Sequence, residues 1–441
     1  MQLAQQILFI VLAAVAIWLF VRQVKFIRRN INLGREEAIN DNPSARWRNT
    51  LLMAFGQKRM FDKPLVGLLH FLVYAGFLII NIEILEIILD GIFGTHRLFV
   101  PYLGSFYGFV INFFEILAFG VLTSCAIFLI RRNWVKVRRL NMKELNGWPR
   151  SDANYILIFE IVLMTLFLVM NASDKALQIQ GHEHYGQTSD FFVSGFITPL
   201  FQNLSTPTLI GIERSAWWLH IAGVFVFLNY LPYSKHLHIV LAFPNTYFAR
   251  LTSQGKMRNM PEIQNEVLYA MQPETAPTEV AADVQPKKFG ARDVFDLSWK
   301  NLLDAYSCTE CGRCTAVCPA NQTGKLLSPR KIMMDTRDRM EVVGKNIDKN
   351  GSFTDDGKAL LHDYITAEEL RACTSCQACV QACPVLIHPL DIINQLKRYM
   401  IMEESNAPAE WNGMFSNIEN NFAPWKFSPD ERDGWAAEMN S

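Results

Sequence analysis

Residues 308–319 read CTECGRCTAVCP, and residues 373–384 read CTSCQACVQACP. Each stretch holds four cysteines in the spacing C-x2-C-x2-C-x3-C, followed by proline. This run is typical of proteins that hold two [4Fe-4S] clusters, where three closely spaced thiolates bind one cluster and the fourth cysteine ligates the other. The proline turns the chain away from a continuing helix. The two copies therefore predict one domain with two clusters.

The same spacing predicts crossed ligation between the runs. Cluster one is expected to take Cys308, Cys311, Cys314 and Cys383, and cluster two Cys373, Cys376, Cys379 and Cys318. A structural zinc site is the alternative, but zinc typically uses cysteine pairs separated by a longer gap. Eight cysteines gathered in one quarter of the chain also argue against a disulfide scaffold. The ninth, Cys125, lies alone in an apolar stretch and is expected to be a packing residue.

The rest of the chain has the composition of a membrane protein. With 441 residues it is too long for one ordinary domain. Half of the residues are hydrophobic and only 19% are charged, against roughly 25% in soluble domains. The 42 basic and 42 acidic side chains balance, so the net charge gives no reason to expect a nucleic-acid partner.

Five apolar stretches are long enough to cross a membrane as helices. They span residues 3–24, 65–89, 106–130, 154–171 and 216–242. Basic residues alternate between the connections: nine in 25–63 and seven in 131–152, but one in 90–105 and two in 172–214. Because basic connections stay in the cytoplasm, the N-terminus is expected outside and everything after about 243 inside.

The sequence therefore predicts an all-α protein, with a transmembrane bundle followed by a cytoplasmic helical two-cluster domain. The expected divisions are a membrane domain (1–243), a linker (244–295), a two-[4Fe-4S] domain (296–400) and a tail (401–441). Within the linker, residues 272–290 lack periodicity. The segment that begins at Pro329 is expected to form a helix over the clusters, and the tail carries no helical periodicity after about Glu404.

Histidines in the apolar stretches suggest a haem. His70 lies six residues after Pro64, and His238 six residues before Pro244. In antiparallel helices these positions have similar depth, so the pair could ligate one b haem. His220 and His238 are 18 residues apart, five turns of one helix, and would share a face. Stretch two offers no histidine at the depth of His220, so His220 and His236 are further candidates without an assigned partner.

Ionisable side chains within the spans are candidates for function because burying them in a membrane is costly. Glu83, Glu115 and Glu160 are the clearest of these. Lys235 is instead expected to extend toward the membrane surface as an anchor. His96, His182 and His184 fall in the external connections and are expected to face water.

The pattern resembles two known families. Five helices, His70, and two histidines 18 residues apart look like the nitrate reductase γ-subunit, a quinol-linked cytochrome b. Its fusion to a two-cluster module is similar to membrane-bound heterodisulfide-reductase-like oxidoreductases, including membrane electron-transfer-flavoprotein:quinone oxidoreductases. Residues 296–304, DLSWKNLLD, and 232–238, PYSKHLH, look especially like the latter. The resemblance implies a cytochrome b-like bundle in a bacterial or archaeal cytoplasmic membrane.

Two departures limit what the resemblance implies. Relatives often hold two haems, whereas here one ligand in the second stretch is missing, so only His70 and His238 are carried over. Full-length relatives continue into Cys-Cys-Gly repeats, and this chain has no adjacent cysteine pair. A cytoplasmic subunit bearing such repeats or a flavin is therefore the expected partner, besides membrane lipid and quinone.

Three functions remain open at this point. The first is an electron-transfer subunit of a membrane oxidoreductase complex, which links a soluble redox partner to quinone through two [4Fe-4S] clusters and haem b. The second is a quinone-independent conduit that anchors a soluble dehydrogenase. The third is a redox sensor, which predicts no haem.

Overall fold

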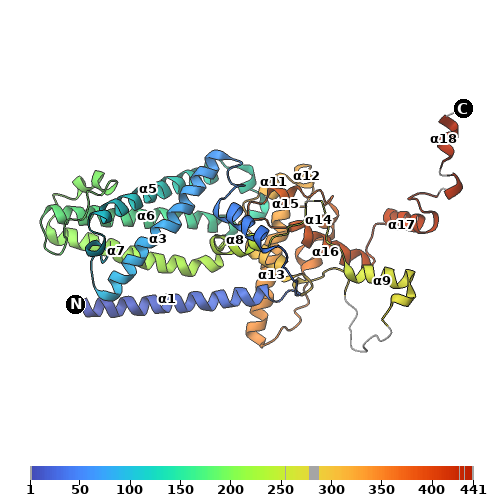
Figure 1. Cartoon of the computed structure of the whole chain (residues 1–441), viewed down its shortest axis with the longest axis horizontal. Coiled ribbons are helices and arrows are strands. Elements are labelled where there is room, and N and C mark those ends of the chain that lie inside the picture. The colour runs from blue at the N-terminus through green and yellow to red at the C-terminus, as the bar shows by residue number, and fades with distance from the viewer. Residues whose placement is uncertain (1, 254, 278–287, 427, 432, 440–441) are drawn as a thin grey trace.

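The computed structural model describes residues 2–253, 255–277, 288–426, 428–431 and 433–439. These residues form helices and short helical turns, without a β-strand, which confirms the all-α class. A long bundle occupies one half of the molecule and a compact cluster of shorter helices packs against one end of it (Figure 1). We call this end of the bundle the docked end and the opposite one the far end.

Four helices of the bundle are long and apolar enough to cross a membrane. They are α1 (Gln2–Ile31), α3 (Pro64–Phe93), α5 (Ser105–Asn133) and α6 (Trp148–Ile179). A fifth helix, α7 (Thr206–Tyr230), packs against α6 and α1. It contains Glu213, Arg214 and His220 and is not among the helices apolar enough to count as a membrane span. The described residues thus support a membrane protein, and five crossings remain a prediction.

The predicted helix over 216–242 is divided in the structure. α7 ends at Tyr230, and two 3-10 turns, Leu231–Tyr233 and Lys235–Leu237, precede α8 (His238–Tyr247). Pro232 lies at this break, where its ring and missing N–H oppose a continuing helix. The expectation that His220 and His238 share one helix face is therefore wrong.

The predicted two-[4Fe-4S] domain (296–400) is called the dicluster domain below. It is built around α13 (Pro329–Asn350), which confirms the helix predicted from Pro329. Its other helices are α10 (Trp299–Tyr306), α11 (Arg313–Ala316), α12 (Pro319–Gln322), α14 (Ala367–Arg371), α15 (Ala378–Ala382) and α16 (Pro389–Met402). Leu302, Ile332, Met340 and Leu396 are buried in its core. The core also contains Cys308, Cys318, Cys379 and Cys383, so both cysteine runs belong to one packed unit.

The linker and the tail contain more helix than the sequence indicates. α9 (Pro261–Met271) lies within the predicted linker, whose residues 278–287 fall outside the described part of the chain. In the tail, α17 (Ala409–Asn421) and α18 (Gly434–Met439) correct the expectation of an aperiodic segment. Trp411, Phe415 and Ile418 recur at helical spacing in α17, a signal that the polar composition of the tail obscures.

α1 extends beyond the bundle and contacts the dicluster domain. Asn30 donates from Nδ2 to the Tyr306 hydroxyl at 3.0 Å. Gly344 of α13 faces the same Asn30, and a Cβ at this glycine would lie 2.4 Å from Asn30 Oδ1. Just beyond α1, Arg35 exchanges backbone hydrogen bonds with Leu297 and Trp299. The start of the chain therefore holds the dicluster domain at the end of the bundle.

Candidate redox centres

Four cysteines from both runs line one cavity in the dicluster domain. Cys318 of the first run lies there with Cys373, Cys376 and Cys379 of the second. Leu327, Pro329, Leu390 and Ile393 form an apolar wall, while Cys376 is exposed to solvent. The first run thus contributes its fourth cysteine to the neighbourhood of the other three, an arrangement that suits crossed ligation.

The remaining four cysteines form a second group nearer the bundle. Burial raises the pKa of the Cys383 thiol, and charge repulsion from Cys311 and Cys308 raises it further. The pKa of Cys308 is raised to about 12, again mainly by burial. Such thiols are protonated at neutral pH, and metal binding displaces the protons because the thiolate is the ligand.

Two of the thiols receive hydrogen bonds from the backbone. Among the described residues, no three His, Cys, Asp or Glu side chains converge as the ligands of a single metal ion would. Backbone amides point at two of the sulfurs: Ser375 N donates to Cys373 Sγ at 3.4 Å, and Ile387 N to Cys383 Sγ at 3.3 Å. Amide hydrogen bonds to sulfur are one of the means by which proteins tune cluster potentials.

His70 and His238 come together at the docked end of the bundle. Their ring centres are 6.5 Å apart, with 43° between the ring planes. His70 Nδ1 lies 2.9 Å from Gln57 Oε1, and His238 Nδ1 lies 3.1 Å from the Lys235 carbonyl oxygen. Each of these acceptors takes the Nδ1 proton and leaves Nε2 free for a metal, which is the usual pattern around metal-bound histidine.

The other two candidate histidines differ from this pair. The His236 ring packs against Phe77, Phe227 and His238, with centre distances of 6.5, 5.5 and 5.5 Å, as an aromatic core residue would. His220 is buried in α7, where Nδ1 lies 2.9 Å from the Leu163 carbonyl oxygen and Nε2 has no hydrogen-bond partner. His220 thus has the hydrogen bonding of a ligand, but it does not share the site of His70 and His238.

Side chains from the loops of the bundle contact the segments that carry cluster one. Arg59 donates from Nη1 to the Cys383 carbonyl at 2.7 Å, and Arg139 donates to the Cys311 carbonyl. Arg313, between Cys311 and Cys314, returns a hydrogen bond of 2.7 Å to the Arg59 carbonyl. The cluster-one cysteines are therefore attached directly to the docked end, where the histidine pair lies.

Lys235 joins the histidine pair to the cysteines. Its carbonyl accepts from His238, and its ammonium group pairs with Glu310, which lies between Cys308 and Cys311. Burial would raise the pKa of Glu310, but Lys235 and Arg337 outweigh this effect and lower it. The side chain of Lys235 is only 11% exposed, so the expectation of a lysine extended toward the membrane surface is wrong.

Replacing Lys235 by methionine is expected to loosen this junction. Glu310 would stay buried with one of its two cationic partners missing, at a cost of about 1–3 kcal/mol in the free energy of unfolding. The temperature at which the visible absorption of the clusters is lost measures this effect. Lys349→Met, at an exposed lysine of the same domain, is the control and should leave this temperature unchanged. Equal loss temperatures in both variants would contradict the role assigned to Lys235.

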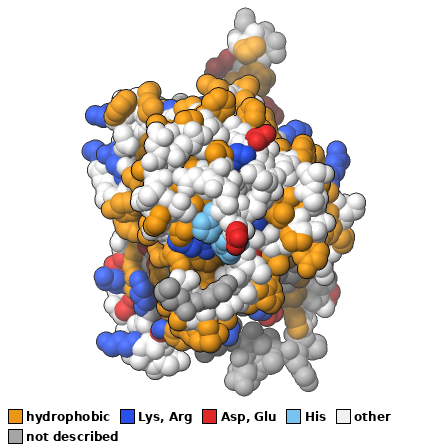
Figure 2. Space-filling model, turned by 90° about the vertical axis from the view of Figure 1, so that its left-hand side faces the viewer, with side chains coloured by type: hydrophobic (Ala, Val, Ile, Leu, Met, Phe, Trp, Pro, Cys, Tyr) orange, Lys and Arg blue, Asp and Glu red, His pale blue; other side chains and the backbone are white. Residues whose placement is uncertain are grey.

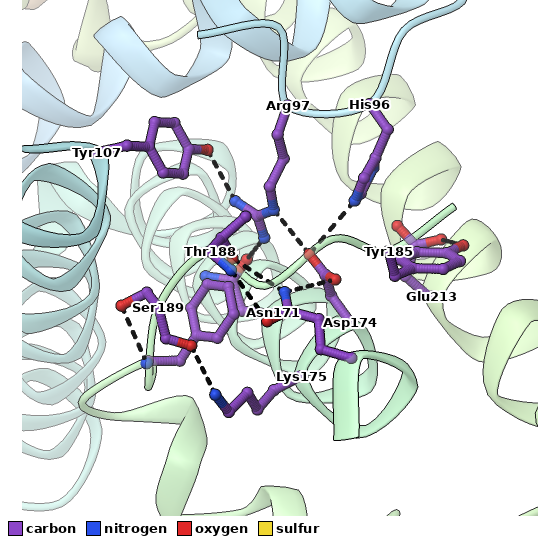
Figure 3. Close-up of polar contacts among 12 residues, drawn as sticks. His96, Arg97, Tyr107, Asn171, Asp174, Lys175, Tyr185, Thr188, Ser189 and Glu213 are labelled. Atoms are coloured by element: carbon purple, nitrogen blue, oxygen red, sulfur yellow. Dashed lines mark hydrogen bonds and ion pairs between the residues drawn. The ribbon is translucent and has the colours of Figure 1, made fainter. Parts of the chain in front are cut away.

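A second polar cluster lies at the far end of the bundle, and the sequence did not predict it (Figure 3). Arg97 donates to Asp174 Oδ2 at 2.7 Å, to the Tyr107 hydroxyl at 2.9 Å and to Asn171 Oδ1 at 2.9 Å. His96 Nε2 is 3.5 Å from the same Asp174 oxygen, so the prediction that His96 faces water is wrong. These partners are distant in sequence, and no local pattern indicates that they meet.

Two of the carboxylates near the far end accept hydrogen bonds from backbone amides. Glu86 accepts from Phe99 N at 2.8 Å, and Glu115 from Val193 N at 2.8 Å. Glu83 retains one buried oxygen without a partner. Figure 2 looks onto this end, where histidine side chains lie at a hollow within a largely hydrophobic face. The cavity there is lined by His182, His184, Arg214, Trp217 and Trp218, among others.

Comparisons with known proteins indicate the class to which the domain with the cysteine runs belongs. Residues 307–387 match the family model of the 4Fe-4S dicluster domain. The homologues of the chain are iron–sulfur oxidoreductases, and the chain fits the heterodisulfide-reductase-like membrane group predicted from its motifs. No solved structure matches it.

Individual relatives are similar over different shares of the chain. The "probable iron-sulfur-binding oxidoreductase FadF" of Bacillus subtilis is 28% identical over 99% of this chain and 61% of that protein. The "EtfAB:quinone oxidoreductase" of Syntrophomonas wolfei is 28% identical over 90% of this chain and 55% of that protein. The "probable membrane-anchored ferredoxin" of Chromohalobacter salexigens is 32% identical over 34% of this chain and 24% of that protein. The chain thus spans less than two thirds of the length of the first two relatives.

Proposed function

We propose that the chain transfers electrons between a soluble redox partner and the membrane quinone pool, as a subunit of a membrane oxidoreductase complex. The observation that carries this proposal is the junction at Lys235. One residue contacts His238 through its carbonyl and Glu310, in the first cysteine run, through its ammonium group. Lys235 therefore connects a proposed haem ligand of the bundle with the first cysteine run of the dicluster domain.

The proposed cofactors are two [4Fe-4S] clusters and one haem b. Cys308, Cys311, Cys314 and Cys383 would hold cluster one, and Cys373, Cys376, Cys379 and Cys318 cluster two. His70 and His238 would hold the haem, and His220 is the remaining ligand candidate if a second haem binds. Each group accepts and releases one electron at a time, while the chain positions it and controls its exposure to solvent.

The order of the centres follows from their exposure. Cys376 is open to solvent, which suits exchange of electrons with a soluble partner at cluster two. Cluster one, attached to the bundle through Arg59 and Arg139, would connect cluster two with the haem. The proposed orientation has the N-terminus outside, α7 as the fifth crossing, and the dicluster domain in the cytoplasm.

Quinone coupling is tested by adding a reduced quinol analogue to the purified chain. The proposal expects the α-band of reduced haem to appear, at a rate that depends on the quinol concentration. The alternative, a quinone-independent conduit that anchors a dehydrogenase, expects reduction by dithionite but not by quinol. The quinone link draws its support from the relative that is described as a quinone oxidoreductase.

The proposed partner is a cytoplasmic subunit that bears Cys-Cys-Gly repeats or a flavin. The exposed side of α17 is one surface that could bind it, since Trp411, Phe415 and Ile418 lie at positions i, i+4 and i+7 and are 36–45% exposed. Aromatic side chains of this kind are frequent at the centres of protein interfaces.

Affinity purification in mild detergent should recover this partner with the chain. Changing Trp411 and Phe415 to alanine should reduce the amount recovered, because both changes remove apolar contact area without touching the clusters. Asn412→Ala, an exposed polar position on the same helix, is the matched control. The proposal of a bound partner would be contradicted if the chain were recovered alone and reduced quinone at full rate with a small soluble electron donor.

A further inference from the structure

A cleft opens between the loops of the bundle and the dicluster domain, and it adjoins the cysteine cavity at Gln377. Its cavity has a volume of about 90 Å³. Arg59 lines it from the loop before α3, and Arg250, Lys256 and Arg258 from the segment after α8. Lys300 of α10 and His388, the residue before α16, line it from the dicluster domain. A cavity of this volume admits a small ion, whereas sites for drug-sized ligands enclose roughly 300–1,000 Å³.

The cleft carries an excess of positive charge. Two carboxylates, Asp304 and Asp391, face its five cationic side chains. Asp304 is engaged by Lys300 at 2.6 Å, and Asp391 lies 3.7 Å from Arg258. Arg250 and Lys256 have no carboxylate partner among the residues that the structure describes. Positive charge in a partly enclosed cleft concentrates anions.

Two hydrogen-bond donors in the cleft point toward each other. His388 Nδ1 accepts from Asp391 N at 3.1 Å, so the proton of the neutral ring is on Nε2. Nε2 lies 3.4 Å from Arg250 Nη1, which can only donate. Neither nitrogen can accept from the other, so both remain available for an acceptor placed beside them.

We propose that this cleft binds a phosphate group, with Arg250, Lys256 and His388 as its donors. A phosphate oxygen accepts from a guanidinium, an ammonium and an imidazole N–H at the same time, and these are among the strong hydrogen bonds in proteins. The phosphate comes either from a soluble compound or from the headgroup of an anionic lipid, since the cleft adjoins the docked end of the bundle. Gln377 and Val380 also line it, which places the bound charge beside the loop of Cys376 and Cys379.

The test measures phosphate binding by the full chain. The chain is placed in nanodiscs of zwitterionic phosphatidylcholine, and radiolabelled inorganic phosphate is followed by equilibrium dialysis. Saturable binding of about one phosphate per chain is expected. Arg250→Gln combined with Lys256→Gln should weaken it at least about tenfold, because two charged donors are lost. Lys256→Gln alone changes an exposed side chain and provides a second variant with little risk to folding.

The matched control combines Lys349→Gln with Lys358→Gln, which removes the same charge from exposed positions outside the cleft. It should bind phosphate like the unaltered chain, and the visible spectrum of the clusters should be the same in all variants. The measurement is repeated with the chain in nanodiscs of phosphatidylglycerol. Weaker binding of inorganic phosphate would identify a lipid headgroup as the source, and undiminished binding would identify a soluble phosphate. Absent saturable binding, or equal binding by the cleft variant and the control, would overturn the proposal. Neither readout depends on quinone activity. Failure of the phosphate proposal can therefore be distinguished from failure of the proposed electron transfer.

Discussion

Replacing Cys318 by serine is expected to remove the cluster whose other ligands are in the second cysteine run. The two clusters of the unaltered chain should contain about eight iron and eight sulfide after haem extraction, and those of the variant about four of each. The reason is geometric: Cys318 lines the cavity of Cys373, Cys376 and Cys379, although it follows Cys314 by only four residues. Serine lacks the soft thiolate that iron–sulfur clusters select.

Pairs of substitutions show which cluster is lost. Adding Cys376→Ser to Cys318→Ser should remove no more iron, because both residues serve the same cluster. Adding Cys311→Ser should remove the remainder. Iron analysis and electron paramagnetic resonance of the reduced protein measure both outcomes. If instead Cys311→Ser adds nothing and Cys376→Ser empties the domain, the fourth cysteine serves its own run and the crossed assignment is wrong.

Changing His70 to alanine is expected to abolish bound haem and to leave the iron–sulfur signals in place. The His70 and His238 rings face one another at 6.5 Å, so loss of one ring removes half of the axial ligation. Pyridine haemochrome analysis gives the haem content, and iron analysis after haem extraction gives the clusters. Gln57→Leu should retain haem with an altered midpoint potential, because it removes only the hydrogen bond to Nδ1.

His184→Ala is the control for this experiment, since this exposed histidine lies at the far end of the bundle. Its haem content should equal that of the unaltered chain. A full haem signal in His70→Ala would exclude His70 as a ligand. Two haems per unaltered chain would show that His220, whose Nε2 is buried without a partner, has found a second ligand.

The cysteines are the most predictable part of this molecule, because their spacing reflects the shape of the cluster they bind. The meeting of His70 with His238 is also expected from the sequence, although from a wrong premise. Matching their depths assumes one helix through residue 242, whereas Pro232 ends α7 and His238 begins α8. The depth argument survives because the break lies at the end of the bundle and displaces His238 little along it.

Contacts between distant segments are beyond the reach of the sequence. Gln57 is an ordinary polar residue before α3, and nothing near it indicates that it would orient His70. The local sequence predicts a surface anchor at Lys235, because its partner Glu310 lies 75 residues further along the chain. The far-end network joins Arg97 and Asp174 across a similar separation. In each case the pairing depends on how the two domains and their loops pack, which no local periodicity encodes.

The attachment of the dicluster domain at several separate points would restrict how electrons reach the membrane in the proposed transfer. Asn30 packs against Gly344, Arg35 pairs with the backbone before α10, and Asn245 donates to the Val385 carbonyl at 2.9 Å. Domains joined by one linker and a small interface are expected to move relative to each other, but this one is tied to the bundle at both of its sides. In the proposed electron transfer, the dicluster domain would therefore stay fixed on the bundle. The proposed soluble partner would have to reach it at one fixed surface.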